Sequence, residues 1–522
     1  MKYLAHINKE LQEQSLQEHC VNTYEAIKEV ASERKLTHCL KLAALLHDCG
    51  KASEAFQQYL MKAVQENIIL PKVNHSSAGA QILLETCKLY NSSDDTLAKL
   101  MLSQTIVSHH GLNDFLDLNG NNKLQKRCYP EKVLDMDHIK SYLEETTRMQ
   151  DIIKLYEEAR EEIFQYVRNF TKLNRTNDCK DVLFYLGALQ RMLISLLVHG
   201  DREDTRNFME HTQTVCYQTQ DLWQEASEKL ESYLSDITAN ATANEINALR
   251  ASISEQCKGF GARAPGIYRL SCPTGSGKTL ASLRYALQHA QRYHKKHIIY
   301  VAPYKTILEQ NAEVLKQFFA EDSVLEHHSN IIPSEYTDYD YFSSSWNKPV
   351  ILTTAVRLFD VLFKDRTTDV RRFHQLADSI LIFDEAQKIP VKTVFMFNEM
   401  MNFLAYNCNT TIILCTATQP LLEKTKYPIQ LSSEPEIICQ TEALQKKFKR
   451  VHIEDACRKD GYTMLDLADF IFQKMIPGNS LLTIVNTKAE ALSLYHACIQ
   501  HQEINDHPLI ILTLYYLSVI LF

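Results

Sequence analysis

The stretch Ser271-Cys272-Pro273-Thr274-Gly275-Ser276-Gly277-Lys278-Thr279 decides the fold of the second half of the chain. The apolar run 267–270 before it predicts a short strand, and residues 280–287 after it predict a helix. A glycine-rich turn that ends in Gly-Lys-Thr between a strand and a helix is the context that a phosphate-binding P-loop requires. Backbone N–H groups would cradle the phosphates, Lys278 would reach the β- and γ-phosphates, and Thr279 would ligate Mg²⁺. The residues predicted to bind Mg-ATP are Thr274, Gly275, Ser276, Gly277, Lys278 and Thr279.

Further apolar runs that alternate with helical stretches surround this motif. They cover residues 298–302, 350–353, 379–383 and 411–415. Continuous apolar strands between helices predict a parallel sheet covered on both faces, with ligands bound beyond the carboxyl ends of its strands. Asp384 and Glu385 directly follow one of these runs. We therefore expect Asp384 to complete the Mg²⁺ site and Glu385 to orient or deprotonate the attacking water.

The bulk composition is that of a globular protein. Of the 522 residues, 45% are hydrophobic and 23% are charged, and the net charge of −8 gives no global basic field. The 14 cysteines include no Cys-x-x-Cys pair, which argues against a zinc ribbon or a disulfide framework and fits a reducing cytosol. The N-terminus lacks a signal-peptide pattern, and the apolar residues 509–522 are too few for a membrane span. We expect a cytoplasmic protein without membrane attachment, with residues 509–522 as a core strand.

The first 235 residues predict helices throughout, and polar residues follow several of the apolar helical runs. In chain order these residues are His19, His47, Asp48, His75, His109, His110 and Asp201. Imidazole and carboxylate donors together suit divalent first-row metals. A carboxylate beside a histidine can bridge two ions, and two ions about 3.5–4 Å apart can clamp the attacking and leaving oxygens of a phosphodiester. A lone histidine is usually a core residue, so the ordered set carries the signal.

These residues stand in four motifs: residues 46–52 (Leu-His-Asp-Cys-Gly-Lys-Ala), 74–76 (Asn-His-Ser), 109–111 (His-His-Gly) and 200–202 (Gly-Asp-Arg). In this order they resemble the HD superfamily, and more narrowly the HD nuclease domain of the CRISPR-associated nuclease-helicases of type I systems. The resemblance implies one metal site at His47, Asp48 and Asp201, a second site at His75, His109 and His110, and a match of His19 to the family's first histidine. Asp48 and Lys51 would take part in catalysis. A protonated lysine has no lone pair, so Lys51 is interpreted as a charge partner for phosphate or for Asp48. His6, His38 and His199 are predicted to be structural or at the surface.

The second half carries an independent resemblance. The sequence Asp-Glu-Ala-Gln at 384–387, together with Thr-Ala-Thr at 416–418, resembles superfamily 2 helicases. Residues 302–306 and 353–356 resemble motifs Ia and Ib of that superfamily, which would touch the backbone of a single strand. Asp-Glu-Ala-Gln is also the variant expected in the CRISPR nuclease-helicases, so the resemblance covers nearly the whole chain.

The predicted organisation is multidomain. An all-α HD-type nuclease domain (1–235) and a linker (236–262) precede an α/β RecA-like domain with a parallel sheet (263–432). Residues 433–522 are predicted to be a partial second RecA-like domain, in which 480–488 resemble motif IV. No Gln-x-x-Gly-Arg-x-x-Arg segment of the kind found in motif VI occurs. We therefore expect a C-terminally truncated helicase in which ATP binding is weakened and unwinding is impaired.

The resemblance implies an effector of CRISPR interference in antiviral defence. It would be a metal-dependent single-stranded DNA nuclease coupled to an ATP-dependent 3′-to-5′ DNA helicase, recruited by a Cascade-type surveillance complex. The expected cofactors are ATP with Mg²⁺ and two divalent transition-metal ions such as Mn, Fe, Co or Ni. Two alternatives stay open: a non-catalytic remnant that only binds DNA or a partner, and an HD phosphohydrolase that acts on nucleotides.

Overall fold

The computed structural model describes most of the chain. The described residues are 3–66, 73–86, 93–112, 114–117, 119–129, 135–173, 179–240, 244–328, 336–449, 451–474, 481–500, 510–513 and 518–521. The chain divides into two units, Met1–Phe448 and Lys449–Phe522. The first unit contains every residue of the predicted sites.

The N-terminal part of the first unit is helical, as predicted, apart from one short hairpin. Its elements are β1 (Leu4–Ile7), β2 (Glu13–Ser15), α1 (Leu16–Glu25), α2 (Lys28–Glu33), α3 (Thr37–Leu46), η1 (Cys49–Ala52), α4 (Glu54–Glu66), α5 (Ser77–Thr86), α6 (Ser93–Val107), α7 (Lys123–Cys128), α8 (Met136–Thr146), α9 (Met149–Leu173) and α10 (Cys179–Glu210). The packing follows helical periodicity. In α9, for example, Ile152, Tyr156, Ala159 and Ile163 are fully buried at spacings of three and four residues, the period of one helix face.

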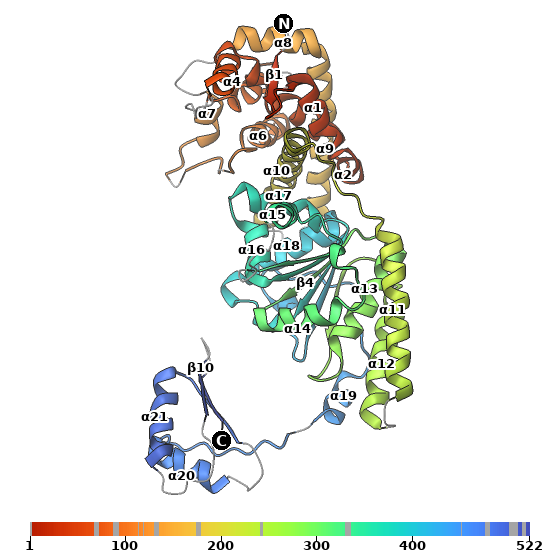
Figure 1. Cartoon of the computed structure of the whole chain (residues 1–522), viewed down its shortest axis with the longest axis vertical. Coiled ribbons are helices and arrows are strands. Elements are labelled where there is room, and N and C mark those ends of the chain that lie inside the picture. The colour runs from red at the N-terminus through yellow and green to blue at the C-terminus, as the bar shows by residue number, and fades with distance from the viewer. Residues whose placement is uncertain are drawn as a thin grey trace. The chain divides into compact units, whose positions relative to one another are not determined.

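A six-stranded parallel sheet follows (Figure 1). Its strands are β3 (Ile267–Ser271), β4 (His297–Ala302), β5 (Val324–His327), β6 (Val350–Thr354), β7 (Ser379–Asp384) and β8 (Thr411–Thr416), in the order β3-β8-β7-β4-β6-β5. Five of these strands contain the predicted runs. Strand β5 was not predicted, because it is a four-residue edge strand that ends in Glu-His and has no long apolar run.

Helices cover both faces of this sheet. Successive strand residues point to opposite sides, so each face carries apolar side chains that helices bury. Ile298 and Tyr300 of β4 pack into one core, and Ile299 and Val301 pack into the other. Helices α11 (Thr219–Asn240), α12 (Glu245–Phe260), α13 (Lys278–Tyr293) and α14 (Lys305–Leu315) contribute to the first core. Helices α16 (Ala355–Phe363) and α18 (Val394–Asn407) contribute to the second. The remaining elements of this part are η2 (Glu321–Ser323), α15 (Tyr336–Ser345), α17 (Thr367–Arg371), η3 (Phe373–Leu376), η4 (Ala386–Lys388), η5 (Val391–Thr393), η6 (Leu422–Lys424) and α19 (Thr441–Lys447).

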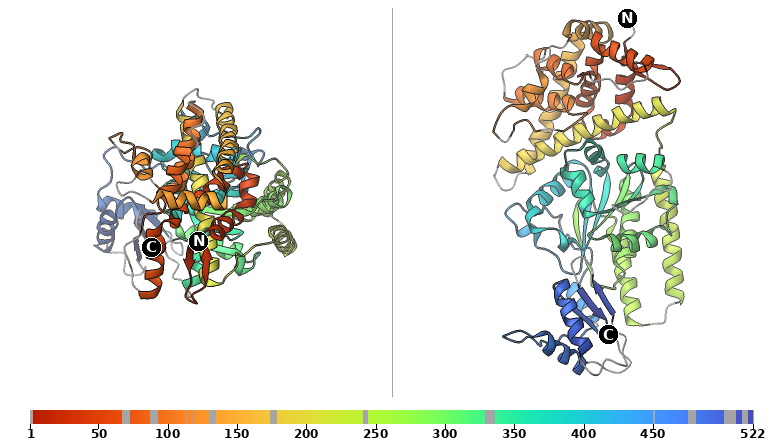
Figure 2. Two further views of the ribbon diagram at one scale, coloured as in Figure 1. Left: turned by 90° about the horizontal axis from the view of Figure 1, so that it is seen from above. Right: turned by 60° about the vertical axis from the view of Figure 1, so that its left-hand side comes forward.

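Helix α10 joins the helical part to the sheet part. It packs on α1, α3, α6 and α9 on one side and on α17, η3 and α18 on the other (Figure 2). The second core therefore runs without a break from the helices of the N-terminal part to one face of the sheet. Among the described residues, α10 is the one helix long and apolar enough to cross a membrane, but 72% of its most apolar window is buried. Its composition is explained by its place in the core.

The second unit has its own small core. Helices α20 (Met464–Lys474) and α21 (Lys488–Gln500) accompany strands β9 (Leu482–Val485), β10 (Ile510–Thr513) and β11 (Ser518–Leu521), which form an antiparallel sheet in the order β10-β11-β9. Strands β10 and β11 fall within the apolar stretch 509–522 that was predicted as a single core strand. Residues 514–517 of that stretch lie outside the described part.

Candidate functional site

The structure brings all the predicted metal-binding residues of the helical part into one cluster. Two of them lie within helices, His19 in α1 and Asp201 in α10. The others lie at helix ends: His47 after α3, Asp48 before η1, His75 before α5, and His109 and His110 after α6. Two glycines permit this convergence. A Cβ atom at Gly50 would lie 2.2 Å from the carbonyl oxygen of His75, and one at Gly200 would lie 2.2 Å from that of Thr23. Only glycine lets these backbones approach so closely.

Asp48 lies at the centre of the cluster, and its two oxygens face different groups of residues. Oδ2 lies 3.2 Å from His19 Nε2 and 3.6 Å from His47 Nε2. Asp201 Oδ1 lies on the same side, 3.4 Å from His19 Nε2. Asp48 Oδ1 lies on the other side, 3.3 Å from His109 Nε2 and 3.5 Å from His75 Nε2. One carboxylate therefore adjoins two sets of ligand atoms, which is the arrangement that a bridging ligand needs.

The second set is completed by His110. Its Nε2 lies 2.8 Å from Nε2 of His75. In each of the two sets, Asp48-His75-His109-His110 and His19-His47-Asp48-Asp201, the possible ligand atoms all lie within 4.8 Å of one another. Each set is compact enough to surround a single cation.

Backbone contacts determine which ring nitrogen of these histidines carries the proton. Nδ1 of His47, His75 and His109 donates to the carbonyl oxygens of Ala44, Val73 and Ile106, at 2.8, 3.0 and 2.6 Å. Because a carbonyl can only accept, the lone pair of each neutral ring is left on Nε2, which faces the cluster. Within the described residues, four buried atoms here have no hydrogen-bond partner: Nε2 of His19, His47 and His109, and Oδ1 of Asp48. Unpartnered buried lone pairs directed at one point fit divalent metal ions.

The charges of the cluster also call for a cation. Burial alone would raise the pKa of Asp48, but the Lys51 ammonium and His47 hold it well below its usual range. Burial alone would lower the pKa of His19, but the charges of the surrounding carboxylates, led by Asp201, raise it to about 10. Several carboxylates in a buried site must be balanced by protons or by metal ions. Metal ions would therefore displace a proton from His19.

Two residues, Asp204 and His6, add to this site in ways that the motifs alone did not indicate. Asp204 accepts from His19 Nδ1 at 2.6 Å and thereby orients the ring. Lys51 Nζ lies 2.7 Å from Asp48 Oδ2 and 3.1 Å from Nε2 of His6, a residue predicted to be structural or at the surface. The sequence did carry a signal for Asp204, because it follows Asp201 by three residues and lies on the same side of the helix. The position of His6 depends on the β1–β2 hairpin, which no alternating apolar pattern predicts.

A cleft of about 450 Å³ opens onto the cluster. Asp48, Lys51, His110 and Asp201 line it together with Arg202 and Arg206 of α10. Arginine side chains beside a metal-binding cluster suit the recognition of phosphate groups.

The P-loop lies at the carboxyl end of β3, as predicted. Gly275 and Gly277 have φ values of +78° and +84°, a backbone region that favours glycine. Gly277 forms the N-cap of α13, so the free N–H groups at the start of this helix face the loop. Thr274 is exposed and Ser276 is buried.

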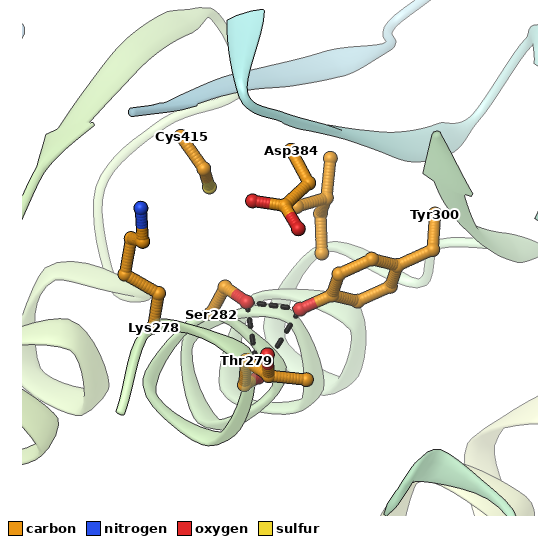
Figure 3. Close-up of a pocket in the computed structure, with 7 residues that line it drawn as sticks. Lys278, Thr279, Ser282, Tyr300, Asp384 and Cys415 are labelled. Atoms are coloured by element: carbon orange, nitrogen blue, oxygen red, sulfur yellow. Dashed lines mark hydrogen bonds between the residues drawn. The ribbon is translucent and has the colours of Figure 1, made fainter. Parts of the chain in front are cut away.

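The predicted magnesium ligands lie on neighbouring elements. Figure 3 shows the Asp384 carboxylate above the N-terminal turn of α13, which carries Lys278 and Thr279. Asn311 of α14 joins them: Thr279 Oγ1 donates to Asn311 Oδ1 at 3.1 Å, and Asn311 Nδ2 donates to Asp384 Oδ2 at 3.3 Å. Sequence reasoning missed Asn311, although a polar residue between Leu308 and Leu315 on the buried side of a helix is a signal that could have indicated it.

The Asp-Glu-Ala-Gln segment at 384–387, called motif II below, contacts the P-loop on one side and the Thr-Ala-Thr loop on the other. Lys278 Nζ donates to Glu385 Oε1 at 3.1 Å. Gln387 donates to Glu385 and accepts a hydrogen bond from Thr416. A chain of hydrogen bonds from Lys278 through Glu385 and Gln387 therefore links the P-loop to Thr416, where the Thr-Ala-Thr loop begins.

Comparisons with known proteins agree with this division into two sites. Residues 4–202 match the family model of the Cas3 HD domain, and residues 263–425 match that of the DEAD/DEAH box helicases. A curated relative, the CRISPR-associated nuclease/helicase Cas3 of Haloferax volcanii, is 24% identical over 232 residues, which are 37% of this chain and 25% of the relative. An HD domain and a helicase domain imply divalent cations and ATP as cofactors in general.

One of the similar solved structures shares the fold. The crystal structure of T. fusca Cas3-ATP matches with a TM-score of 0.53 at 14% identity, over 96% of this chain and 64% of that one. The T. fusca Cas3-ADP structure matches with a TM-score of 0.49 at 14% identity, over 80% of this chain and 50% of that one. The chain thus spans about a quarter of the curated relative and between half and two thirds of these structures. The chain therefore carries an HD domain of the Cas3 type followed by a DEAD/DEAH box helicase domain, the combination expected of a Cas3-type nuclease-helicase.

Proposed function

We propose that this chain hydrolyses phosphodiester bonds of single-stranded DNA at the cluster around Asp48. The observation that carries the proposal is the set of four buried ligand atoms without hydrogen-bond partners among the described residues: Nε2 of His19, His47 and His109, and Oδ1 of Asp48. Desolvating such atoms is costly unless an ion binds them. Two bound divalent ions would supply an activated water and would neutralise charge on the phosphate.

The side chains around the cluster have separate tasks. His47, Asp48 and Asp201 would hold one ion, and His75, His109 and His110 would hold the second. Lys51 keeps Asp48 ionised and presents an ammonium group to the cleft. Arg202 and Arg206 also line the cleft, where they would bind the phosphates of the strand on either side of the scissile bond.

In the helicase domain, we assign nucleotide binding to the P-loop residues 274–279. Thr279 and Asp384 would ligate the Mg²⁺ ion, Lys278 would bind the β- and γ-phosphates, and Glu385 would orient the attacking water. The support is geometric, since Asn311 places Thr279 and Asp384 side by side and Lys278 reaches Glu385.

The wider activity is proposed for the whole protein, because the chain spans only part of its relatives. It comprises 3′-to-5′ unwinding driven by ATP, recruitment by a Cascade-type surveillance complex, and antiviral interference in the cytoplasm. The two domain matches support this proposal.

The test is cleavage of a fluorescent single-stranded oligonucleotide by the purified chain with Mn²⁺, Ni²⁺ or Co²⁺. Asp48→Ala should abolish cleavage, and Glu18→Gln, a change at an exposed carboxylate next to His19, should not. Metal-dependent hydrolysis of small nucleotides without DNA cleavage would indicate a phosphohydrolase instead. A chain that binds DNA but shows no metal-dependent hydrolysis would indicate a non-catalytic binding protein.

A further inference from the structure

Helix α10 carries a row of polar residues on a helix that is otherwise largely apolar in its central part. Arg191, Ser195, His199 and Glu203 recur at intervals of four residues, and Arg202 follows His199 by three, so they lie on one face. Every one of them contacts the helicase domain. The contacts are Arg191 to the carbonyls of Val361 and Lys364, Ser195 to Arg371 and His374, His199 to Arg371, Arg202 to Thr367, and Glu203 to Arg371 and Tyr341.

Glu203 and Arg371 form a buried ion pair on this face. Glu203 is 0% exposed and Arg371 is 4% exposed. Glu203 accepts from the Arg371 guanidinium and, at 3.0 Å, from the Tyr341 hydroxyl. Arg371 also donates to His199 Nδ1. Because both charges are withdrawn from water, loss of either partner leaves an uncompensated buried charge.

The same turn of α10 carries the nuclease ligands. Asp201 and Asp204 face His19, at 3.4 and 2.6 Å, whereas Glu203, between them, faces the helicase domain. Arg206, one turn further, lies over the Tyr341 ring at 3.7 Å. A shift of this turn toward or away from the helicase domain would move Asp201 by the same amount. Displacements of a fraction of an ångström are enough to spoil a metal site.

We propose that Arg371 of the helicase domain is a positioning residue of the nuclease centre. Acting through Glu203, it fixes the turn of α10 that presents Asp201 and Asp204, so metal affinity in the HD domain depends on the helicase domain. This inference rests on the proposed metal-dependent nuclease.

The experiment is a Co²⁺ titration of the full chain followed by the visible absorption of the bound ion, which reports coordination geometry rather than overall stability. Arg371→Met should weaken Co²⁺ binding by about ten-fold or more, the size of effect typical of residues behind a ligand, and should change the spectrum. The matched control is Arg372→Met. Arg372 is also buried, but it bonds Asp369 and the carbonyl of Ser343, within the helicase domain. Its substitution should leave affinity and spectrum unchanged.

Equal affinity in Arg371→Met and wild type would overturn the inference, and so would an equal loss in Arg372→Met. If Arg371→Met does not fold, Tyr341→Phe decides, since it removes only the hydroxyl that donates to Glu203 and keeps the ring beneath Arg206. It should weaken Co²⁺ binding in the same direction by a smaller factor, and an unchanged affinity would count against the inference. A wild-type chain that binds no Co²⁺ would contradict the proposed nuclease itself.

Discussion

Lys278 Nζ lies 3.1 Å from Glu385 Oε1, so the lysine of the P-loop is paired with the glutamate of motif II. A bound nucleotide must take over this lysine, because the γ-phosphate and Glu385 compete for the same ammonium group. Binding of ATP would thereby release Glu385 toward the attacking water. The pairing also gives Gln387 a fixed partner, since Gln387 donates to the other oxygen of Glu385.

Glu385→Gln should separate binding from hydrolysis. We expect ATP hydrolysis to fall by about 10²–10⁴-fold, the usual contribution of a general base, while ATP affinity stays the same or rises because a carboxylate near the γ-phosphate is removed. Phosphate release and the binding of a fluorescent ATP analogue measure the two quantities. Lys278→Ala is the comparison and should lose binding. A parallel loss of binding in Glu385→Gln would contradict the assigned role.

Asn311→Ala should lower the affinity of the nucleotide site for Mg²⁺. Asn311 holds Thr279 and Asp384 together, and residues that orient metal ligands typically change metal affinity by about 10–100-fold. The Mg²⁺ concentration that gives half-maximal ATPase activity should rise by a factor within that range. Gln310→Ala, at an exposed position of the same helix, is the matched control. If both variants need the same Mg²⁺ concentration as wild type, Asn311 does not position the ligands.

Asp204→Asn should lower metal affinity at the HD cluster. The change removes the charge that holds His19 Nδ1 at 2.6 Å, and Gln14 competes for the remaining oxygen because it already donates to this carboxylate at 2.9 Å. We expect about 10–100-fold weaker Mn²⁺ binding by calorimetry. Asp201→Asn should lose more, since it removes a ligand atom. Glu18→Gln should bind like wild type, and a similar loss in that variant would point to general destabilisation of α1.

The residues that sequence reasoning found are those whose chemistry is tied to a local pattern. A P-loop needs its glycines in a row, and a His-Asp pair after an apolar helix is unusual enough to notice, so Lys278 and Asp48 could be selected without a structure. The central strands were equally accessible, because a fully buried parallel strand leaves a continuous apolar run. The edge strand β5 leaves no such run, which is why it was missed.

The residues that were not predicted make contacts across long sequence distances. Asp204 bonds a histidine 185 residues earlier, and Arg371 pairs with a glutamate 168 residues earlier. No spacing rule predicts such contacts, since they depend on how α10 docks on both domains. His6 illustrates the same limit: its neighbour Lys51 is 45 residues away and belongs to a different element. The prediction that His6 is a structural or surface residue could be checked only in the structure, because it depends on where the β1–β2 hairpin lies.

A buried carboxyl between the two domains should make stability depend on pH. Glu399 of α18 is 1% exposed and contacts Tyr185 of α10, and burial raises its pKa to about 7. Between its ordinary value of 4.5 and about 7, the folded chain therefore holds a proton that the unfolded chain has released. The stability contributed by this group is fully present below pH 4.5 and is lost as the pH rises through about 7.

Glu399→Gln, a neutral isostere, removes this dependence. The variant should be more stable than wild type at pH 8, by roughly 1–3 kcal/mol, and the difference should shrink toward pH 5. Thermal unfolding midpoints at a series of pH values measure it, with Glu309→Gln at an exposed position as the control. A difference between Glu399→Gln and wild type that is constant from pH 5 to pH 8 would show that Glu399 is already ionised in the folded chain.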